Sequence, residues 1–371
     1  MVRRGYSMMR RRMSGIGYDM VYKIGIVGTG GIAHAHGKAA QDIDEVELTA
    51  ICDVSQESLD RYGDHFGVKR RYQDLETMLV REDLDFVVIC TWGNSHAEIS
   101  NRIAHSRRVK AIVCEKPICS TAAECEEMIT VAKDNGILLA EAFKFRHHPR
   151  HLKVKELIDS GLIGDVTLIR STFTGAGNPV QMTADRNWRF NKEKGGGAVY
   201  DLGCYCIHHA RFMIGAEPFR VYASGHKGKY NEINEAVAIQ LEFPDEISTQ
   251  IAIAFRYFGS QEAEIYGTDG YIRTDLAWNN ENQPVSLEVK LKNGDRRTYD
   301  FAAVDQFALQ LQHMCACLET GQAHRISPEN SLGQMQVIDA VHASIASGKP
   351  VELHRSSTST PSPSANRLTK A

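Results

Sequence analysis

The feature that most constrains the fold of this chain is a glycine-rich turn near its start. An apolar run over residues 23–27 is followed by the pattern Gly28-x-Gly30-x-x-Ala33. Such a run is typical of a buried parallel strand, and the glycines let the chain turn tightly into a helix. The free amides and the positive dipole end of that helix would bind phosphate. The pattern therefore predicts a dinucleotide-binding site.

An acidic residue follows at the spacing that such a site requires. A second apolar run, residues 47–52, ends at Asp53. A carboxylate at this strand end can accept hydrogen bonds from the adenosine ribose and would repel a 2′-phosphate. We therefore predict NAD rather than NADP as the cofactor. The alternative is that Asp53 only caps a helix in a fold that binds no nucleotide.

The two halves of the chain differ in how strands and helices follow one another. Up to residue 140 they alternate, as in a doubly wound parallel sheet. Beyond it, short strands succeed each other with few helices, which predicts a large, mostly antiparallel open sheet. The predicted architecture is an α/β Rossmann domain over residues 20–143, followed by an α+β domain over residues 144–355. The extension 1–19 and the tail 356–371 are expected to be disordered.

Composition excludes several function classes. The formal net charge of −3, with mixed signs, predicts no basic surface for nucleic acid, and no apolar run approaches the ~20 residues of a membrane span. The nine cysteines suit buried thiols in a cytoplasmic enzyme. Side chains two positions apart on a helix diverge, so we expect no metal at Cys204-x-Cys206 or Cys315-x-Cys317.

Three residues in two distant segments suggest proton chemistry. Lys116 follows the strand expected at 109–114, and three glycines at 195–197 lead towards Asp201 and Tyr205. If this stretch is helical, Asp201 and Tyr205 lie one turn apart on one face. A nearby ammonium would lower the pKa of the phenol from its ordinary value of about 10. We predict that Tyr205 exchanges a proton with the substrate beside Lys116. Asp201 is expected either to orient the substrate or to hold Lys116 protonated. A packed tyrosine and a simple Lys-Pro turn are the alternative.

Taken together, these motifs resemble the glucose–fructose oxidoreductase / inositol dehydrogenase (Gfo/Idh/MocA) family from about residue 21 to 353. Asn94-x-His96 and Glu141-Ala142-Phe143 add to the resemblance. Tyrosine at position 205, where many members have histidine, is similar to the branch with dihydrodiol and xylose dehydrogenases. The resemblance implies an NAD(P)-dependent oxidoreductase acting on a sugar, sugar derivative or cyclitol. It also implies a homo-oligomer, a dimer or tetramer. Helices are expected on one face of the second sheet, and we expect an apolar open face on the other, through which the subunits would join.

The resemblance also implies a set of site residues. We expect cofactor contacts from Gly28, Thr29, Gly30, Gly31, Ile32, Asp53, Thr91, Trp92, Asn94, His96, Glu115, Lys116, Trp188 and Arg189. Arg146 directly follows the Rossmann segment, and we expect substrate contacts from it and from His208, although a cluster at a helix start would explain Arg146 equally well. For Arg189, beside Trp188, contact with substrate or a place in an ordered loop is an equal alternative to contact with the cofactor. His34 and His36 are expected on the surface of the first helix.

Three places depart from the family pattern, and two other functions stay open. Trp92-Gly93 stands where Pro-Asn is usual, His208 stands where this branch often has asparagine, and Lys144 stands where an apolar residue is common. An NAD-dependent, non-redox, glycosidase-like enzyme is one alternative function. A regulatory protein that senses nucleotide is the other.

Overall fold

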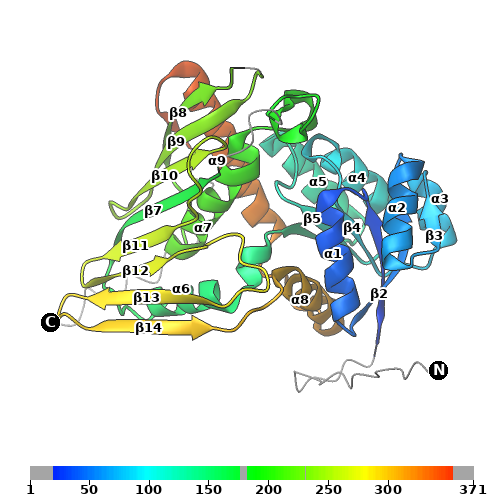
Figure 1. Ribbon diagram of the computed structural model, residues 1–371, viewed down its shortest axis with the longest axis horizontal. Coiled ribbons are helices and arrows are strands. Elements are labelled where there is room, and N and C mark those ends of the chain that lie inside the picture. The colour runs from blue at the N-terminus through cyan, green and yellow to red at the C-terminus, as the bar shows by residue number, and fades with distance from the viewer. Residues whose placement is uncertain (1–19, 176–181, 230, 354–371) are drawn as a thin grey trace, which may run out of the picture.

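The computed structural model describes residues 20–175, 182–229 and 231–353. Within these ranges the chain forms two sheets, each covered by helices (Figure 1). The extension 1–19 and the tail 356–371, both expected to be disordered, lie outside the described residues.

The first sheet is the predicted parallel one. Its strand order is β3-β2-β1-β4-β5-β6, and every pairing in it is parallel. The order reverses between β1 and β4, so a crevice opens at their carboxyl ends, where such sheets bind ligands. The strands are β1 (Tyr22–Val27), β2 (Val46–Cys52), β3 (Arg70–Tyr72), β4 (Phe86–Ile89), β5 (Ala111–Glu115) and β6 (Leu138–Ala142). The short, charged edge strand β3 was missed from the sequence.

Helices cover both faces of this sheet. One face packs against α1 (Gly31–Asp42) and α2 (Gln56–Phe66), and the other against α3 (Leu75–Arg81), α4 (His96–Ser106) and α5 (Ala122–Asp134). A further helix, α8 (Gln306–Thr320), joins α1 on the first face, where Phe307, Leu311 and Met314 are buried in the core of the sheet. We expected this helix in the second domain, so the boundary at residue 143 does not separate the two cores.

The second sheet contains nine strands among the described residues. The order is β14-β13-β12-β11-β7-β10-β9-β8-β15. Its members are β7 (Val166–Thr174), β8 (Arg220–Lys227), β9 (Asn234–Glu242), β10 (Ser248–Ala254), β11 (Ala263–Gly267), β12 (Gly270–Thr274), β13 (Val285–Leu291), β14 (Arg296–Phe301) and β15 (Val351–Glu352). The pairings are antiparallel except that β10 lies parallel to β7. The prediction of a mostly antiparallel sheet is confirmed.

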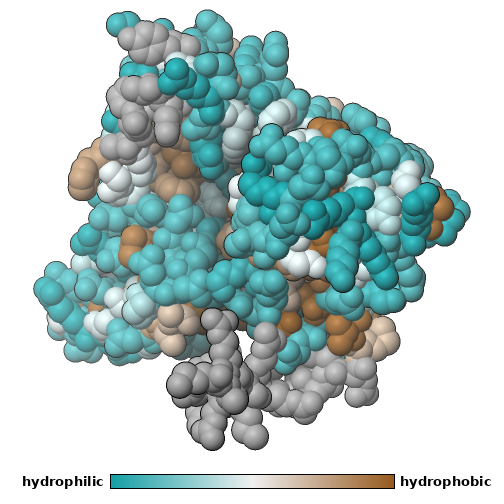
Figure 2. Space-filling view, turned by 45° about the vertical axis from the view of Figure 1, so that its right-hand side comes forward, coloured by the Kyte–Doolittle hydropathy of each residue, from teal (hydrophilic) through white to brown (hydrophobic). Residues whose placement is uncertain are grey.

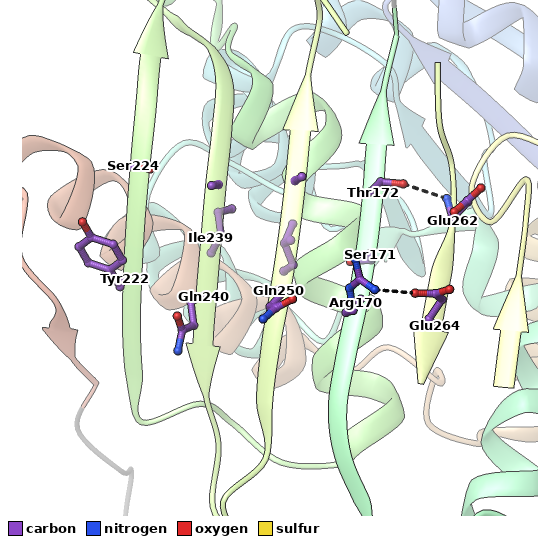
Figure 3. Close-up of a pocket in the computed structure, with 13 residues that line it drawn as sticks. Arg170, Ser171, Thr172, Tyr222, Ser224, Ile239, Gln240, Gln250, Glu262 and Glu264 are labelled. Carbon is purple, nitrogen blue, oxygen red and sulfur yellow. Dashed lines mark hydrogen bonds and ion pairs between the residues drawn. The ribbon is translucent and has the colours of Figure 1, made fainter. Parts of the chain in front are cut away.

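One face of the second sheet is helical and the other is open. The helical face carries α6 (Pro149–Asp159), α7 (Cys204–Ile214) and α9 (Pro328–Ser347) (Figure 1). On the open face a row of polar side chains crosses the strands, including Gln240, Gln250 and an Arg170–Glu264 ion pair (Figure 3). We expected an apolar face here, but alternation along the strands puts the aliphatic residues on the helical side.

The cysteines are placed as expected. All nine are buried free thiols, including Cys204, Cys206, Cys315 and Cys317. In the part of the chain that the structure describes, no helix is both long and apolar enough to cross a membrane. The visible surface is mainly hydrophilic, with scattered apolar residues (Figure 2).

Candidate active site

The glycine turn has the geometry that its pattern predicts. Gly28 has a φ of +87°, and a Cβ there would lie 2.8 Å from the backbone of Cys90 and Thr91. Only glycine fits such a position comfortably. Gly30 and Gly31, by contrast, face open space, and no side chain caps the start of α1. The turn therefore leaves an open approach to the first amides of α1, which is what a pyrophosphate needs.

Asp53 lies directly beside this turn. One carboxylate oxygen accepts hydrogen bonds from the Thr29 amide at 2.7 Å and the Thr29 hydroxyl at 3.0 Å, and the other accepts from the Ser55 amide at 2.9 Å. Asp53 thus shapes the glycine turn as well as marking the end of β2. The side chain is half-buried, so part of it still faces solvent.

The segment after β4 forms the other wall of the crevice. The buried His96 ring lies 2.9 Å from the carbonyl of Pro117 and 3.2 Å from that of Thr91, and so joins the ends of β4 and β5. Trp92 and Asn94 are exposed. Of the cofactor residues expected here, His96 supports the crevice from beneath, whereas Trp92 and Asn94 are open to a ligand.

His36 is not on the surface, contrary to our expectation. It is fully buried, and its Nε2 lies 2.7 Å from Oε1 of Glu115. His34 is half-buried against Tyr62 and Phe66. His36 lies on the buried face of α1, where its ring contacts the carboxylate of Glu115, the residue before Lys116. The sequence contained a signal for this burial. His36 comes three residues after Ala33 and four before Ala40, so helical spacing puts all three on one face.

Lys116, Asp201 and Tyr205 meet at the domain junction. The Lys116 ammonium donates to the Asp201 carbonyl at 2.8 Å and lies 3.2 Å from its carboxylate. The same Nζ lies 4.6 Å from the centre of the Tyr205 ring. Asp201 is in a π-helical turn, η6 (Val199–Gly203), and Tyr205 is in the first turn of α7, so the expected shared orientation is achieved. The convergence of these three residues is what the sequence predicted.

The pKa values in this cluster have opposing causes. Burial raises the pKa of Tyr205 more than the Lys116 ammonium lowers it, so the expected decrease in this pKa is wrong. Burial disfavours the charged form of Lys116, but Tyr205 and Asp201 outweigh it and raise its pKa. Burial likewise opposes ionisation of Asp201, whose pKa is nonetheless lowered by Lys116 and Arg189. The cluster therefore holds a neutral phenol beside a charged lysine.

The glycine triplet positions Arg189. A Cβ on Gly196 would lie 2.5 Å from the Trp188 carbonyl oxygen, and the Gly197 amide donates to the Arg189 carbonyl at 2.9 Å. This close approach brings Nε of Arg189 within 2.7 Å of the Asp201 carboxylate, while its guanidinium lies 4.9 Å from the Trp188 ring. Arg189 thus shares Asp201 with Lys116.

A cavity of about 420 Å³ contains these groups. It extends from Ile32 at the start of α1 to the sheet of the second domain. The side chains around it are Ile32, Lys116, Lys144, Phe173, Thr174, Asn187, Arg189, Phe190, Asp201, Leu202, Tyr205, Phe255 and Asn279. Lys144 and Asn279 were not expected there. The departure of Lys144 from the family pattern was the only signal in the sequence.

Arg146 and His208, expected to contact substrate, do not line this cavity. Both are buried, and the guanidinium of Arg146 lies 2.8 Å from Nε2 of His208 and 3.1 Å from the carbonyl of Arg325. The Arg146 guanidinium also stacks 3.7 Å from the Phe212 ring centre. The short helix after β6 turns the side chain of Arg146 away from the cavity, so these contacts place the pair in the core of the second domain.

Comparison with known proteins agrees with this geometry. Residues 22–143 match the model of an oxidoreductase family with an NAD-binding Rossmann fold, and residues 151–273 match the GFO/IDH/MocA C-terminal domain. The chain belongs to the GFO/IDH/MocA oxidoreductase family. It is therefore an NAD(P)-dependent oxidoreductase of the group whose members act on sugars and cyclitols.

Curated relatives of this family match nearly the whole chain. It is 28% identical over 329 residues to "D-xylose 1-dehydrogenase (NADP(+)) 2" of Haloferax volcanii, with 89% of this chain and 99% of the relative covered. Identity to an inositol 2-dehydrogenase of Rhizobium meliloti is 26% over 349 residues, covering 90% of this chain and 100% of the relative. The match to both of these relatives is thus spread over the two domains.

Solved structures share the fold. An aldose–aldose oxidoreductase from Caulobacter crescentus, complexed with glycerol, superposes with a TM-score of 0.82 at 24% identity, covering 90% of this chain and 100% of that one. A 3-ketoreductase from Actinomadura kijaniata, in complex with NADP and TDP-benzene, gives a TM-score of 0.80 at 24% identity, covering 87% and 98%.

Proposed function

We propose that this member of the family transfers hydride between NAD and a hydroxyl or carbonyl carbon of a sugar, sugar derivative or cyclitol, with Tyr205 as the acid/base. The observation that carries the proposal is the Lys116 ammonium held 4.6 Å from the Tyr205 ring in a cavity that begins at the glycine turn. A tyrosine that only packs in the core, or a Lys-Pro pair that only forms a turn, would not require an ammonium beside the phenol ring.

The residues present fit a dinucleotide. Gly30 and Gly31 leave space at the uncapped end of α1, Ile32 lines the start of the cavity, and Trp92 and Asn94 are exposed beside it. When bound, the nicotinamide supplies the hydride acceptor or donor. Two buried side chains support this site. Glu115, at the end of β5, contacts His36 of α1, and His96 contacts the Pro117 carbonyl just after β5.

The proton is handled by residues of this chain. In the direction of reduction, the neutral Tyr205 phenol donates its proton to the oxygen of the substrate carbonyl. The Lys116 ammonium stabilises the phenolate that remains. In oxidation the same phenolate accepts the proton of the hydroxyl. Asp201 positions Lys116 through two contacts and leaves Arg189 at the cavity edge, where either cofactor or substrate can meet it.

The proposal of NAD rests on Asp53. Its carboxylate stands at the end of β2, beside the glycine turn, where a 2′-phosphate would bring two further negative charges close to it. The relative from Haloferax volcanii uses NADP by name, so the family accommodates both cofactors.

The acid/base pair argues against a nucleotide-sensing regulatory protein, and an assay distinguishes the glycosidase-like alternative. A protein that only senses nucleotide needs no acid/base pair in the adjoining cavity. A non-redox glycosidase-like enzyme would regenerate its cofactor within each turnover, so reduced cofactor would not accumulate. The experiment that decides is a screen of the purified protein against sugars and cyclitols with NAD and with NADP, monitored by the absorbance of reduced cofactor. Substrate consumption without any absorbance change would contradict the proposal.

We also propose that the chain forms a homo-oligomer, a dimer or tetramer, through the open face of the second sheet. The polar row across β8, β9, β10, β7 and β11 offers paired donors and acceptors rather than an apolar patch (Figure 3). Analytical ultracentrifugation of the protein and of a Gln250→Glu variant tests this. A monomer at micromolar concentration, or an assembly indifferent to the substitution, would contradict it.

A further inference from the structure

Lys144 is a buried lysine inside the cavity that the proposed reaction does not use. It begins the short helix η2 (Lys144–His147) directly after β6, and only 7% of its side chain is exposed. Burying an ammonium is costly unless it is paired and hydrogen-bonded. An ammonium at this position therefore depends on the polar partners around it.

The contacts of Lys144 hold its ammonium in place from one side. The Nζ donates to Oδ1 of Asn279 at 3.0 Å, forms an ion pair with Glu281, and lies 5.1 Å from the centre of the Phe307 ring. Lys144 and Asn279 line the cavity, whereas Glu281 is not among its lining residues. The carboxylate thus anchors the lysine from behind.

The charges that face the cavity are unbalanced. Lys116, Lys144 and Arg189 line it, against the single carboxylate of Asp201. Lys116 and Arg189 both use that same carboxylate. Burial and the neighbouring Lys116 ammonium lower the pKa of Lys144 to about 7, and the carboxylates of Glu115 and Asp305 oppose this decrease only in part. A ligand that brings negative charge would relieve this imbalance.

Building on the proposed function, we infer that Lys144 is a specificity-determining residue that binds an anionic group, a carboxylate or a phosphate, on the sugar substrate. The amide of Asn279 offers a further donor to the same group. Charge-assisted hydrogen bonds of this kind are about twice as strong as neutral ones. The chain is thereby matched to acidic or phosphorylated sugars rather than to neutral polyols.

The test compares matched substrates that differ only in charge, such as glucose, glucuronate and glucose 6-phosphate, or inositol and its phosphate. We expect the wild-type protein to favour the charged sugars by at least about tenfold in kcat/KM, mainly through a lower KM. A factor of this size corresponds to one charge-assisted contact that the neutral sugars cannot make. Comparison of glucuronate with glucose 6-phosphate shows whether the site binds a carboxylate or a phosphate. Lys144→Met should abolish the preference for charged sugars, and Lys144→Arg should restore part of it.

A second variant separates an anion site from a subsite that reads hydroxyl groups. Glu281→Gln removes the carboxylate that competes for the ammonium, so an anion site should bind charged sugars more tightly. A Lys–Asn–Glu hydroxyl subsite would lose affinity for neutral sugars instead, and that result would overturn the inference. Lys110→Met, a surface lysine paired with Asp85, controls for a general change in charge. Thermal denaturation of each variant controls for folding.

Binding keeps this inference distinct from the proposed function. Calorimetric titration of the NADH-loaded protein with glucuronate, glucose and inorganic phosphate requires no turnover. Anion binding that Lys144→Met abolishes would support the inference even if no substrate were oxidised, a result that would count against the proposed function alone. Equal binding of charged and neutral sugars by wild type and variant would overturn the inference, whether or not the enzyme turns over.

Discussion

The Lys116 ammonium faces the Tyr205 ring at 4.6 Å, although one residue ends a strand of the first sheet and the other begins a helix on the second. Asp201 fixes this relationship, because both its carbonyl and its carboxylate accept from the same Nζ. The proposed acid/base group and its charged neighbour are therefore assembled only when the two domains pack together. The predictions that concern chemistry follow from this contact.

Tyr205→Phe removes the proton exchanged with the substrate. Loss of a general acid/base costs roughly 10²–10⁴-fold in rate, so we expect a fall of that order in kcat. The affinity for NADH, measured by fluorescence titration, should be nearly unchanged. Tyr200→Phe is the matched control, since its hydroxyl donates to the Ser120 carbonyl at 2.9 Å and does not line the cavity. Equal activity of the two variants would contradict the assignment.

The pH profile should differ between the two directions of reaction. Burial raises the pKa of Tyr205, so the phenol is neutral well above neutral pH. Reduction needs this neutral donor and should be insensitive to pH near 7. Oxidation needs the phenolate, so its kcat/KM should rise about tenfold per pH unit towards the alkaline side. Because Lys116 lowers the phenol pKa, Lys116→Met should move this rise to still higher pH. A pH profile of Lys116→Met that matches the wild-type profile would contradict the proposed role of Lys116.

Asp53→Asn should relax the choice of cofactor. The amide oxygen can still accept from the Thr29 amide, so the glycine turn is retained, but the negative charge is lost. We expect the ratio of kcat/KM for NADP to that for NAD to rise by about tenfold or more, because like-charge repulsion is removed. Steady-state kinetics with both cofactors measure this ratio. A wild-type enzyme that already prefers NADP would contradict the proposal.

Two glycines of the turn should respond differently to alanine. Gly28→Ala places a Cβ 2.8 Å from backbone atoms at a φ of +87°, so we expect a loss of more than about 1 kcal/mol in the free energy of unfolding. Gly30→Ala meets no atom within 4 Å and has a φ of −75°. It should leave stability almost unchanged while lowering NAD affinity, because the methyl group occupies the approach to the phosphates. Urea denaturation and NADH titration distinguish the two effects.

Glu141 provides a prediction about stability. It is buried, its Oε1 accepts from the Ile118 amide at 3.0 Å, and burial raises its pKa to about 7. The folded state thus binds this proton more tightly than the unfolded state, so the contribution of Glu141 to stability falls as pH rises from about 4.5 to 7. Glu141→Gln keeps the acceptor and should stabilise the protein at pH 8 by roughly 1–3 kcal/mol, with little effect at pH 5. Urea denaturation at both values would show this, and a loss of stability at pH 8 would contradict it.

The sequence predicted the fold and the central site because local patterns carry both. Apolar runs marked the core strands, and the glycine turn, Lys116 and Tyr205 follow strand ends or begin helices, where topology brings them together. Strand β3 was missed because Arg70, Arg71 and Tyr72 form a short, charged edge without an apolar pattern. Strand β12 was missed because it follows closely after β11, and the Asp269-Gly270 dipeptide at its start is typical of a turn.

What the sequence could not predict depends on long-range packing. The parallel pairing of β7 with β10 is invisible in chain order, because segments between them fill other places in the sheet. The position of Lys144 depends on the loop that carries Asn279, and the net pKa of Tyr205 depends on burial by several elements. Arg146 was expected to contact substrate because it directly follows the Rossmann segment, yet its partners are the buried His208 and a backbone carbonyl.

Helix α8 completes the core of the first domain with residues from near the end of the chain. During synthesis, the nucleotide-binding half must therefore wait for the substrate half to be made before its last apolar surface is covered. An isolated fragment ending near residue 143 would leave the surface that receives Phe307, Leu311 and Met314 open to water, and we expect it to aggregate rather than bind nucleotide. If so, cofactor binding requires the whole polypeptide, because a single helix from the end of the chain closes the core of the nucleotide-binding domain.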